Sequence, residues 1–194
     1  ANTMHNSAVA HSLLGDTDKA LEQFLEALST FQKLEHIGGE GRSRHGIGVT
    51  LANAGHNERA VDFFARAIEL RHKISDIRGL AKSLCAKGDA LRELKRVDEA
   101  LASHGEANRI AISDIDKIRA LVGLARDYLD RSNAAAAIAA LDQALTRAAP
   151  ANHVQRGLAY SQRGQAYALR REWQKSENDL KQAIAIHRQN GSSI

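Results

Sequence analysis

The chain has 194 residues, of which 43% are hydrophobic, 26% charged and only 4% aromatic, and its formal net charge is +4. Charges of both signs are interspersed, so no basic block points to nucleic acid as a partner, and no apolar run approaches the ~20 residues that cross a membrane. The single cysteine, Cys85, excludes an internal disulfide and favours a reducing, cytoplasmic location. One proline and few β-branched runs predict an all-α chain.

A short pattern recurs along the chain. Ala20-x3-Phe24-x2-Ala27 has counterparts that begin at Ala60, Ala100, Ala137 and Ser176, at intervals of 40, 40, 37 and 39 residues. Twelve residues before each copy stands another small residue, and a larger one follows it three positions later. The repeat residues that we predict to be structural are Ala8, Gly15, Ala20, Phe24, Ala27, Gly48, Ala60, Phe64, Ala67, Gly88, Ala100, Ala107, Ala125, Tyr128, Ala137, Leu141, Ala144, Gly164, Tyr167, Leu180 and Ala183.

Each repeat contains two amphipathic stretches of about 15 residues joined by a short polar turn, as at 15–17 and 55–57. Glycine suits the end of the first helix, and aspartate, threonine or asparagine can cap the start of the second. Small residues allow two helices to cross at ~8–10 Å. One such hairpin cannot bury its apolar face alone, so hairpins must stack.

We therefore predict a single array of five antiparallel helix hairpins over residues 1–194. The expected repeats are about 1–36, 37–76, 77–114, 115–153 and 154–194. The helical pattern begins at the first residues, and Ile194 falls where a sixth repeat would begin. We therefore expect the chain to be a fragment of a longer protein.

Three stretches resemble the tetratricopeptide repeat. Leu121-x2-Leu124-Ala125-x2-Tyr128 and Tyr160-x2-Arg163-Gly164-x2-Tyr167 are similar to the signature of its first helix, and Ala60-x3-Phe64-x2-Ala67 to that of its second. The resemblance implies a right-handed superhelical solenoid whose first helices line the concave groove. The first-helix tryptophan is missing, His104 replaces the usual apolar ring, and the period exceeds the family's ~34 residues. Such long repeats resemble those of kinesin light chains, LGN-type scaffolds and bacterial signal-transducing ATPase regulators.

The same resemblance implies which side chains of the first helices point into the groove. Its central row of arginine and lysine suits carboxylates or phosphates, so we expect an acidic or C-terminal segment to bind there. Alternatively, these charges are only solvated. His5, Val9 and Ala86 replace residues of the family's chaperone-binding clamp, so a chaperone tail is not expected. The predicted groove residues are Arg42, His45, Asn53, Lys82, Asp89, Arg92, Arg119 and Arg126.

Several histidines, the cysteine and the tryptophan suggest more specific roles. His5, His45 and Cys85 stand at equivalent places in three repeats and could form a zinc site, but first helices ~8–10 Å apart make polar lining the expected role. We expect His104 to be a buried, hydrogen-bonded core residue. We expect Trp173 to pack between helices, with a surface anchor for a partner as the alternative.

Catalytic patterns are missing from the sequence. It contains no Gly-x-Gly-x-x-Gly, phosphate loop, nucleophile elbow or His-Glu-x-x-His, so we predict no enzyme and no cofactor. The predicted function is a protein-interaction scaffold that binds a peptide or protein segment in its groove. The alternative is the sensor arm of a signalling or transcriptional regulator that responds by changing its superhelix. Self-association through the C-terminal hairpin is a third hypothesis.

Overall fold

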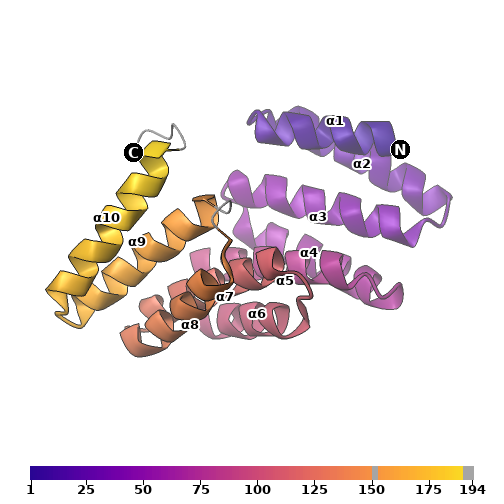
Figure 1. Cartoon of the computed structure of the whole chain (residues 1–194). Coiled ribbons are helices and arrows are strands. Elements are labelled where there is room, and N and C mark those ends of the chain that lie inside the picture. The colour runs from indigo at the N-terminus through magenta and orange to yellow at the C-terminus, as the bar shows by residue number, and fades with distance from the viewer. Residues whose placement is uncertain (150–152, 190–194) are drawn as a thin grey trace. The chain divides into compact units, whose positions relative to one another are not determined.

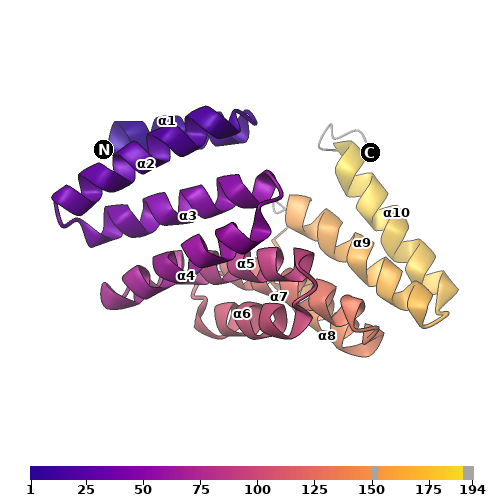
Figure 2. The same ribbon diagram turned by 180° about the vertical axis from the view of Figure 1, so that it is seen from behind.

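Ten α-helices and no strands make up residues 1–149 and 153–189, which are the residues that a computed structural model describes. The helices are α1 (Asn2–Leu13), α2 (Thr17–Lys33), α3 (Ile37–Asn53), α4 (Asn57–Lys73), α5 (Ile77–Glu93), α6 (Val97–Ile110), α7 (Asp114–Asp130), α8 (Ala134–Arg147), α9 (His153–Leu169) and α10 (Trp173–Gln189). Figure 1 and Figure 2 show consecutive helices as hairpins, for example α3 with α4 and α9 with α10. The prediction of an all-α chain of five hairpins is confirmed. Ile194 lies outside the described residues.

The hairpin turns fall where the sequence predicts them, and each contains one residue with a left-handed backbone. Gly15 and Gly55 have φ values of 79° and 83°. Lys95, Ser132 and Arg171 hold the equivalent places with φ of 62°, 58° and 60°. A left-handed residue reverses the chain directly after a helix, which lets the next helix start within a few residues.

Side chains also cap helices that follow these turns and helices that follow the connections between hairpins. Oδ1 of Asp76 accepts a hydrogen bond of 2.9 Å from the backbone N–H of Gly79, at the start of α5. Oδ1 of Asn133 accepts one of 3.1 Å from Ala136 at the start of α8. These contacts satisfy backbone donors that have no partner within the helix.

The chain divides into two compact units, Ala1–Glu99 (unit 1) and Ala100–Ile194 (unit 2). Within unit 1, α3 packs against both α1 and α5, and α2 and α4 cover the other side of these three helices. In residues 1–99, α2 and α4 do not pack against each other, so the layer of first helices is the more closely packed one. That layer is therefore the concave side of unit 1, and we call the surface that α1, α3 and α5 present there the inner face. In unit 2, α9 packs against α7, α8 and α10.

Close crossings of helices explain the small residues of the repeat. Phe64 is 1% exposed, and a Cβ atom added at Gly48 would lie 2.6 Å from its ring. The buried members of the structural set are Ala8, Ala20, Phe24, Ala27, Gly48, Ala60, Phe64, Ala67, Gly88, Ala100, Ala107, Ala125, Ala137, Leu141, Ala144, Gly164 and Ala183. Tyr128 and Tyr167 are half-buried, and Gly15 is exposed in its turn. Leu180 packs over Gly164 of α9 but is still 39% exposed, because within the described part of unit 2 α10 packs against α9 alone.

Candidate binding face

Two histidine–serine contacts connect the first helices of unit 1. Nδ1 of His5 on α1 lies 3.3 Å from Oγ of Ser43 on α3, and Nδ1 of His45 on α3 lies 3.0 Å from Oγ of Ser83 on α5. Both contacts join residues 38 positions apart, so the same polar link is used twice along the inner face. The two serines are completely buried, whereas the two imidazoles are half-buried at the surface.

A phenylalanine ring packs against each of the two imidazoles. The ring centroids of His5 and Phe24 are 5.3 Å apart in an edge-to-face arrangement, and those of His45 and Phe64 are 5.6 Å apart. Each imidazole is thus fixed by a buried ring on one side and a serine on the other. The third member of this row, Cys85, is buried, and the described residues contain no group of three side chains that could hold a metal ion.

A buried arginine lies behind this polar row. Arg71 extends from α4 and is only 5% exposed. Its Nη1 donates to the carbonyl oxygen of Gly79 and, at 2.8 Å, to Oγ of Ser83. Its Nε has no hydrogen-bond partner, and the nearest carboxylate oxygen, Oδ2 of Asp76, is 3.8 Å away. Burial lowers the pKa of Arg71, the charge of Asp76 opposes that change, and the charge of Arg42 adds to it.

The contacts of Arg71 also orient the histidine beside it. A guanidinium can only donate, so Ser83 accepts from Arg71 and can use its own hydroxyl hydrogen for Nδ1 of His45. A neutral His45 in this arrangement carries its proton on Nε2. Glycine is required at position 79, since a Cβ atom there would lie 2.0 Å from Oδ2 of Asp76.

Two of the predicted groove residues of unit 1 are cations without an acidic partner. Arg42 is exposed, its Nη2 donates to Oδ1 of Asn2 at 3.2 Å, and its guanidinium lies 5.8 Å from the centroid of the Phe31 ring. Lys82 is exposed at the equivalent place on α5. Neither residue forms an ion pair within residues 1–149 and 153–189. Their charges are therefore available to a ligand.

The other groove residues of unit 1 differ from these two cations. Arg92 pairs with Glu93 at 2.7 Å, which neutralises its charge. Asp89 is half-buried on α5, and Asn53 is exposed at the end of α3. His45 takes part in the contacts to Ser83 and Phe64 described above. The unpaired positive charge of the inner face is thus concentrated toward the first halves of α3 and α5.

The positive charges of the inner face affect the pKa of His5. Burial of the ring is the main cause that lowers the pKa of His5, and the charges of Arg42 and Arg71 lower it further. Phe24, its neighbour on α2, is uncharged. Burial and two nearby guanidinium groups both disfavour the protonated form of this imidazole.

The last two predicted groove residues, Arg119 and Arg126, belong to α7 of unit 2. Arg119 is exposed, and its Nη1 lies 3.7 Å from Oδ1 of the buried Asp116. Arg126 is half-buried. Six of the eight predicted residues therefore belong to unit 1 and two to unit 2.

Unit 2 has a buried, hydrogen-bonded histidine–aspartate pair in place of the aromatic ring of unit 1. Nδ1 of His104 lies 2.6 Å from Oδ2 of Asp127, and the two side chains are 1% and 0% exposed. A Cβ atom added at Gly123 would lie 2.5 Å from the imidazole, so the glycine makes room for the ring. His104 is the buried, hydrogen-bonded residue that the sequence predicts.

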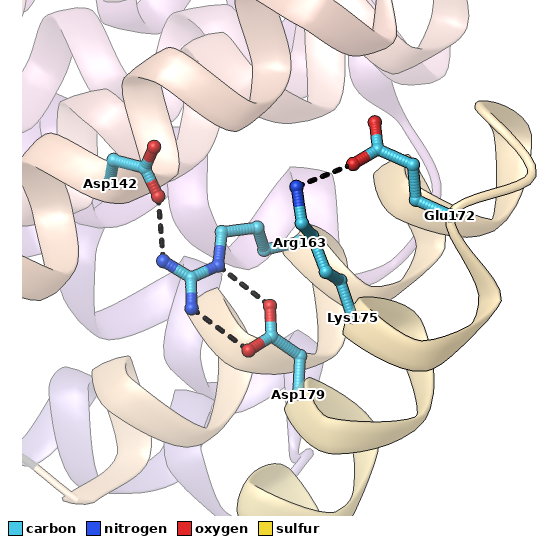
Figure 3. Close-up of polar contacts among 5 residues, drawn as sticks. All are labelled: Asp142, Arg163, Glu172, Lys175 and Asp179. Atoms are coloured by element: carbon cyan, nitrogen blue, oxygen red, sulfur yellow. Dashed lines mark hydrogen bonds and ion pairs between the residues drawn. The ribbon is translucent and has the colours of Figure 1, made fainter.

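An arginine joins three helices of unit 2. Figure 3 shows Arg163 of α9 between Asp142 of α8 and Asp179 of α10. Nη1 lies 2.6 Å from Asp142, and Nε and Nη2 lie 2.6 Å and 2.8 Å from the two oxygens of Asp179. These carboxylates raise the pKa of Arg163. In the same figure Lys175 pairs with Glu172 at 2.7 Å.

The prediction for Trp173 is wrong. Its side chain is 65% exposed, because it is the first residue of α10 and projects beyond the crossing with α9. Further exposed apolar residues of α9 and α10 are Val154, Leu158, Leu169, Leu180 and Ile184. Self-association through this hairpin stays a prediction. None of the described helices has the length and apolar character to span a membrane.

Sequence reasoning missed Arg71, Asp127 and Asp179. All three look like surface charges, yet all are buried. One signal was available for Arg71: it stands 40 residues after the buried Phe31, at a repeat position where a charge is unexpected.

Comparison with known proteins agrees with this arrangement. Two sequence models described as tetratricopeptide repeat match residues 1–73 and 157–190, together more than half of the chain. No curated protein matches the sequence.

Several solved structures share the fold at low sequence identity. Nearly identical TPR-like repeats assigned to a kinesin light chain of Podosopora anserina are 18% identical, with a TM-score of 0.77 over 99% of this chain and 97% of that one. BtubC from P. vanneervenii is 16% identical, with a TM-score of 0.82 over 96% and 79%. Residues 41 to the end of MamA from Desulfovibrio magneticus RS-1 are 19% identical, with a TM-score of 0.70 over 98% and 97%.

Proposed function

Because the chain belongs to the tetratricopeptide repeat family, we propose that it is a protein-interaction scaffold and that the inner face of unit 1 binds an extended segment with acidic residues. One observation carries the proposal. Arg42 and Lys82 occupy equivalent places on successive first helices, both are exposed, and neither has a carboxylate partner among the described residues.

Other arginines of unit 1 do have a carboxylate partner. Arg44 pairs with Glu40 at 2.8 Å, Arg66 with Glu69 at 3.0 Å, and Arg92 with Glu93 at 2.7 Å. Carboxylates are thus placed beside several arginines and are missing beside the two cations of the inner face. An acidic side chain of a bound segment would provide the missing charge, with arginine offering a two-pronged donor.

The rigid row beneath these cations supports the same function. His5 and His45 are held by serines and aromatic rings, so a segment would meet a preformed surface with little side-chain entropy to lose. The exposed Asn2 and Asn53 offer amide groups to the backbone of the segment.

A displayed library of short random peptides, selected on the whole chain, tests the proposal without a known partner. We expect the selected peptides to be rich in aspartate and glutamate and to lose binding in the double variant Arg42→Glu/Lys82→Glu. The matched control is Arg59→Glu/Lys73→Glu, which makes the same charge change at two exposed residues of α4 that form no ion pair with described residues. Peptides that bind both variants equally well would refute the proposed face.

The same complexes address the alternative of a sensor arm. A scaffold should keep its radius of gyration in small-angle scattering when a selected peptide binds. A clear change in that radius would favour a regulatory role through change of shape.

A further inference from the structure

The inner face of unit 1 contains a local cluster of basic groups with little acidic compensation: Arg42 has no carboxylate partner among the described residues, and Arg71 has only Asp76, 3.8 Å from its Nε. Arg42 contacts Asn2, one helical turn before His5, and this brings its guanidinium next to the imidazole. Arg71 approaches from α4, and its Cγ would lie 3.6 Å from a Cβ atom at Gly41, the residue before Arg42. The three basic side chains therefore come from α1, α3 and α4, and the charges of Arg42 and Arg71 both act on His5.

We propose that Arg42, Arg71 and His5 form a binding site for one oxyanion, a carboxylate or phosphate group carried by the bound segment. The site rests on the proposed function and specifies which part of the inner face reads the charge. Arg42 is the direct ligand, because Nη2 alone is used, on a neutral amide, and the remaining N–H groups of its fork can donate to two oxygens.

Arg71 is a positioning residue in this site. Its guanidinium is fixed by Gly79 and Ser83, and Asp76 lies too far away for a hydrogen bond to its Nε. A buried charge is screened less than a surface charge, so Arg71 adds a positive potential that does not depend on a flexible side chain. The anion is held by Arg42 within that potential.

His5 makes the site sensitive to pH. The charged groups that act on it are Arg42 from α3 and Arg71 from α4, both positive, and its contacts on α2 and α3 are the uncharged Phe24 and Ser43. A bound anion would oppose the two positive charges and raise the pKa of His5 toward or above its ordinary value. By linkage, the anion then binds more tightly as the pH falls through that range.

The test uses the whole chain with ¹³C-labelled histidine, and assigns the His5 signal with the variant His5→Gln. The probes are two short peptides capped at both ends, a tetraglutamate and a phosphoserine flanked by glycines, with a capped tetraglutamine as the neutral control. We expect at least one acidic probe to raise the pKa of His5 in a saturable way, whereas the glutamine peptide leaves it unchanged. The probe that acts at the lower concentration identifies carboxylate or phosphate as the preferred anion.

Variants separate the roles of the two arginines. Arg42→Gln should weaken binding of the active probe about tenfold or more, since it removes a charged two-pronged donor. Arg71→Met should weaken it less and should also raise the pKa of His5 in the absence of probe. Arg59→Gln on α4 is the matched control and should change neither quantity.

Two results would overturn the site: a His5 titration that neither acidic probe alters, or equal loss of binding in Arg42→Gln and Arg59→Gln. If Arg71→Met fails to fold, Arg42→Gln, which changes an exposed residue, still decides. Library peptides that bind the inner face without acidic residues, together with an unaffected His5, would remove the oxyanion site and leave the scaffold. If acidic probes raise the pKa of His5 but no library peptide binds the inner face, the oxyanion site would remain and the proposed binding of a peptide segment would be lost.

Discussion

Unit 1 and unit 2 place polar groups between their helices in different ways. In unit 1, imidazoles contact neutral serines and rest on buried phenylalanines, and the cations of the inner face lack carboxylates. In unit 2, His104 meets Asp127, and Arg163 meets both Asp142 and Asp179. Unit 2 thus uses these polar groups to join its own helices, whereas Arg42 and Lys82 of unit 1 have no carboxylate partner among the described residues.

The two units also differ in their aromatic residues, which allows the unfolding of unit 2 to be measured separately. All four phenylalanines, at positions 24, 31, 63 and 64, belong to unit 1. The three tyrosines and Trp173 all belong to unit 2. Tyrosine and tryptophan fluorescence therefore follows unit 2 alone, while far-UV circular dichroism follows the helices of both units.

The largest effect is expected from the buried pair of unit 2. His104→Phe copies the aromatic of unit 1 but leaves the carboxylate of Asp127 buried without its partner, at a cost of about 3–5 kcal/mol in the free energy of unfolding. The double variant His104→Phe/Asp127→Leu removes both polar groups and should recover most of that loss. Guanidinium unfolding followed by tyrosine and tryptophan fluorescence measures both changes. Equal stability of the single and double variants would show that the unpartnered carboxylate of Asp127 is not the cause of the loss.

A smaller loss is expected at the arginine that joins α8, α9 and α10. Arg163→Met leaves Asp179 buried without a counter-charge, which should cost about 2–3 kcal/mol by the same measurement. Arg109→Met is the matched control, since Arg109 is exposed and pairs only with Glu106 on its own helix, where about 0–1 kcal/mol is expected. Similar losses in both variants would mean that Arg163 does not hold the helices together.

The smallest effect concerns the pH dependence of unit 1. Because the folded chain lowers the pKa of His5 below 6.5, the unfolded chain takes up the proton more readily. Stability should therefore fall as the pH drops below about 6.5 and level off below the lowered pKa of the folded state. The contribution should be under roughly 1 kcal/mol, because the ring is only half-buried. Urea unfolding followed by circular dichroism should be less dependent on pH in His5→Gln, and an unchanged dependence would contradict the assignment.

The sequence predicts the fold well because the repeat sets helix length, turn position and the place of each small residue. It also predicts the burial of His104, which stands where Phe24 and Phe64 stand in earlier repeats. It fails where burial depends on a neighbour that periodicity does not reveal. The apolar ring of Trp173 predicts a place between helices, but the helix crossing does not extend to it. The space for Arg71 depends on Gly79 of α5, and only the structure shows that this glycine lies beside the guanidinium.

The turns of the hairpins have a consequence for engineering. Lys95, Ser132 and Arg171 adopt a left-handed backbone that costs a side-chain-bearing residue ~1–2 kcal/mol, whereas Gly15 and Gly55 adopt it freely. Glycine at the three positions would remove that strain and add some flexibility to the unfolded chain, for a net gain of about 1 kcal/mol or less each. These sites lie in the hairpin turns and include neither the residues of the proposed oxyanion site nor the buried pairs of unit 2. Substitutions at these turns should therefore change the thermal stability of the protein while the proposed oxyanion site keeps its own residues.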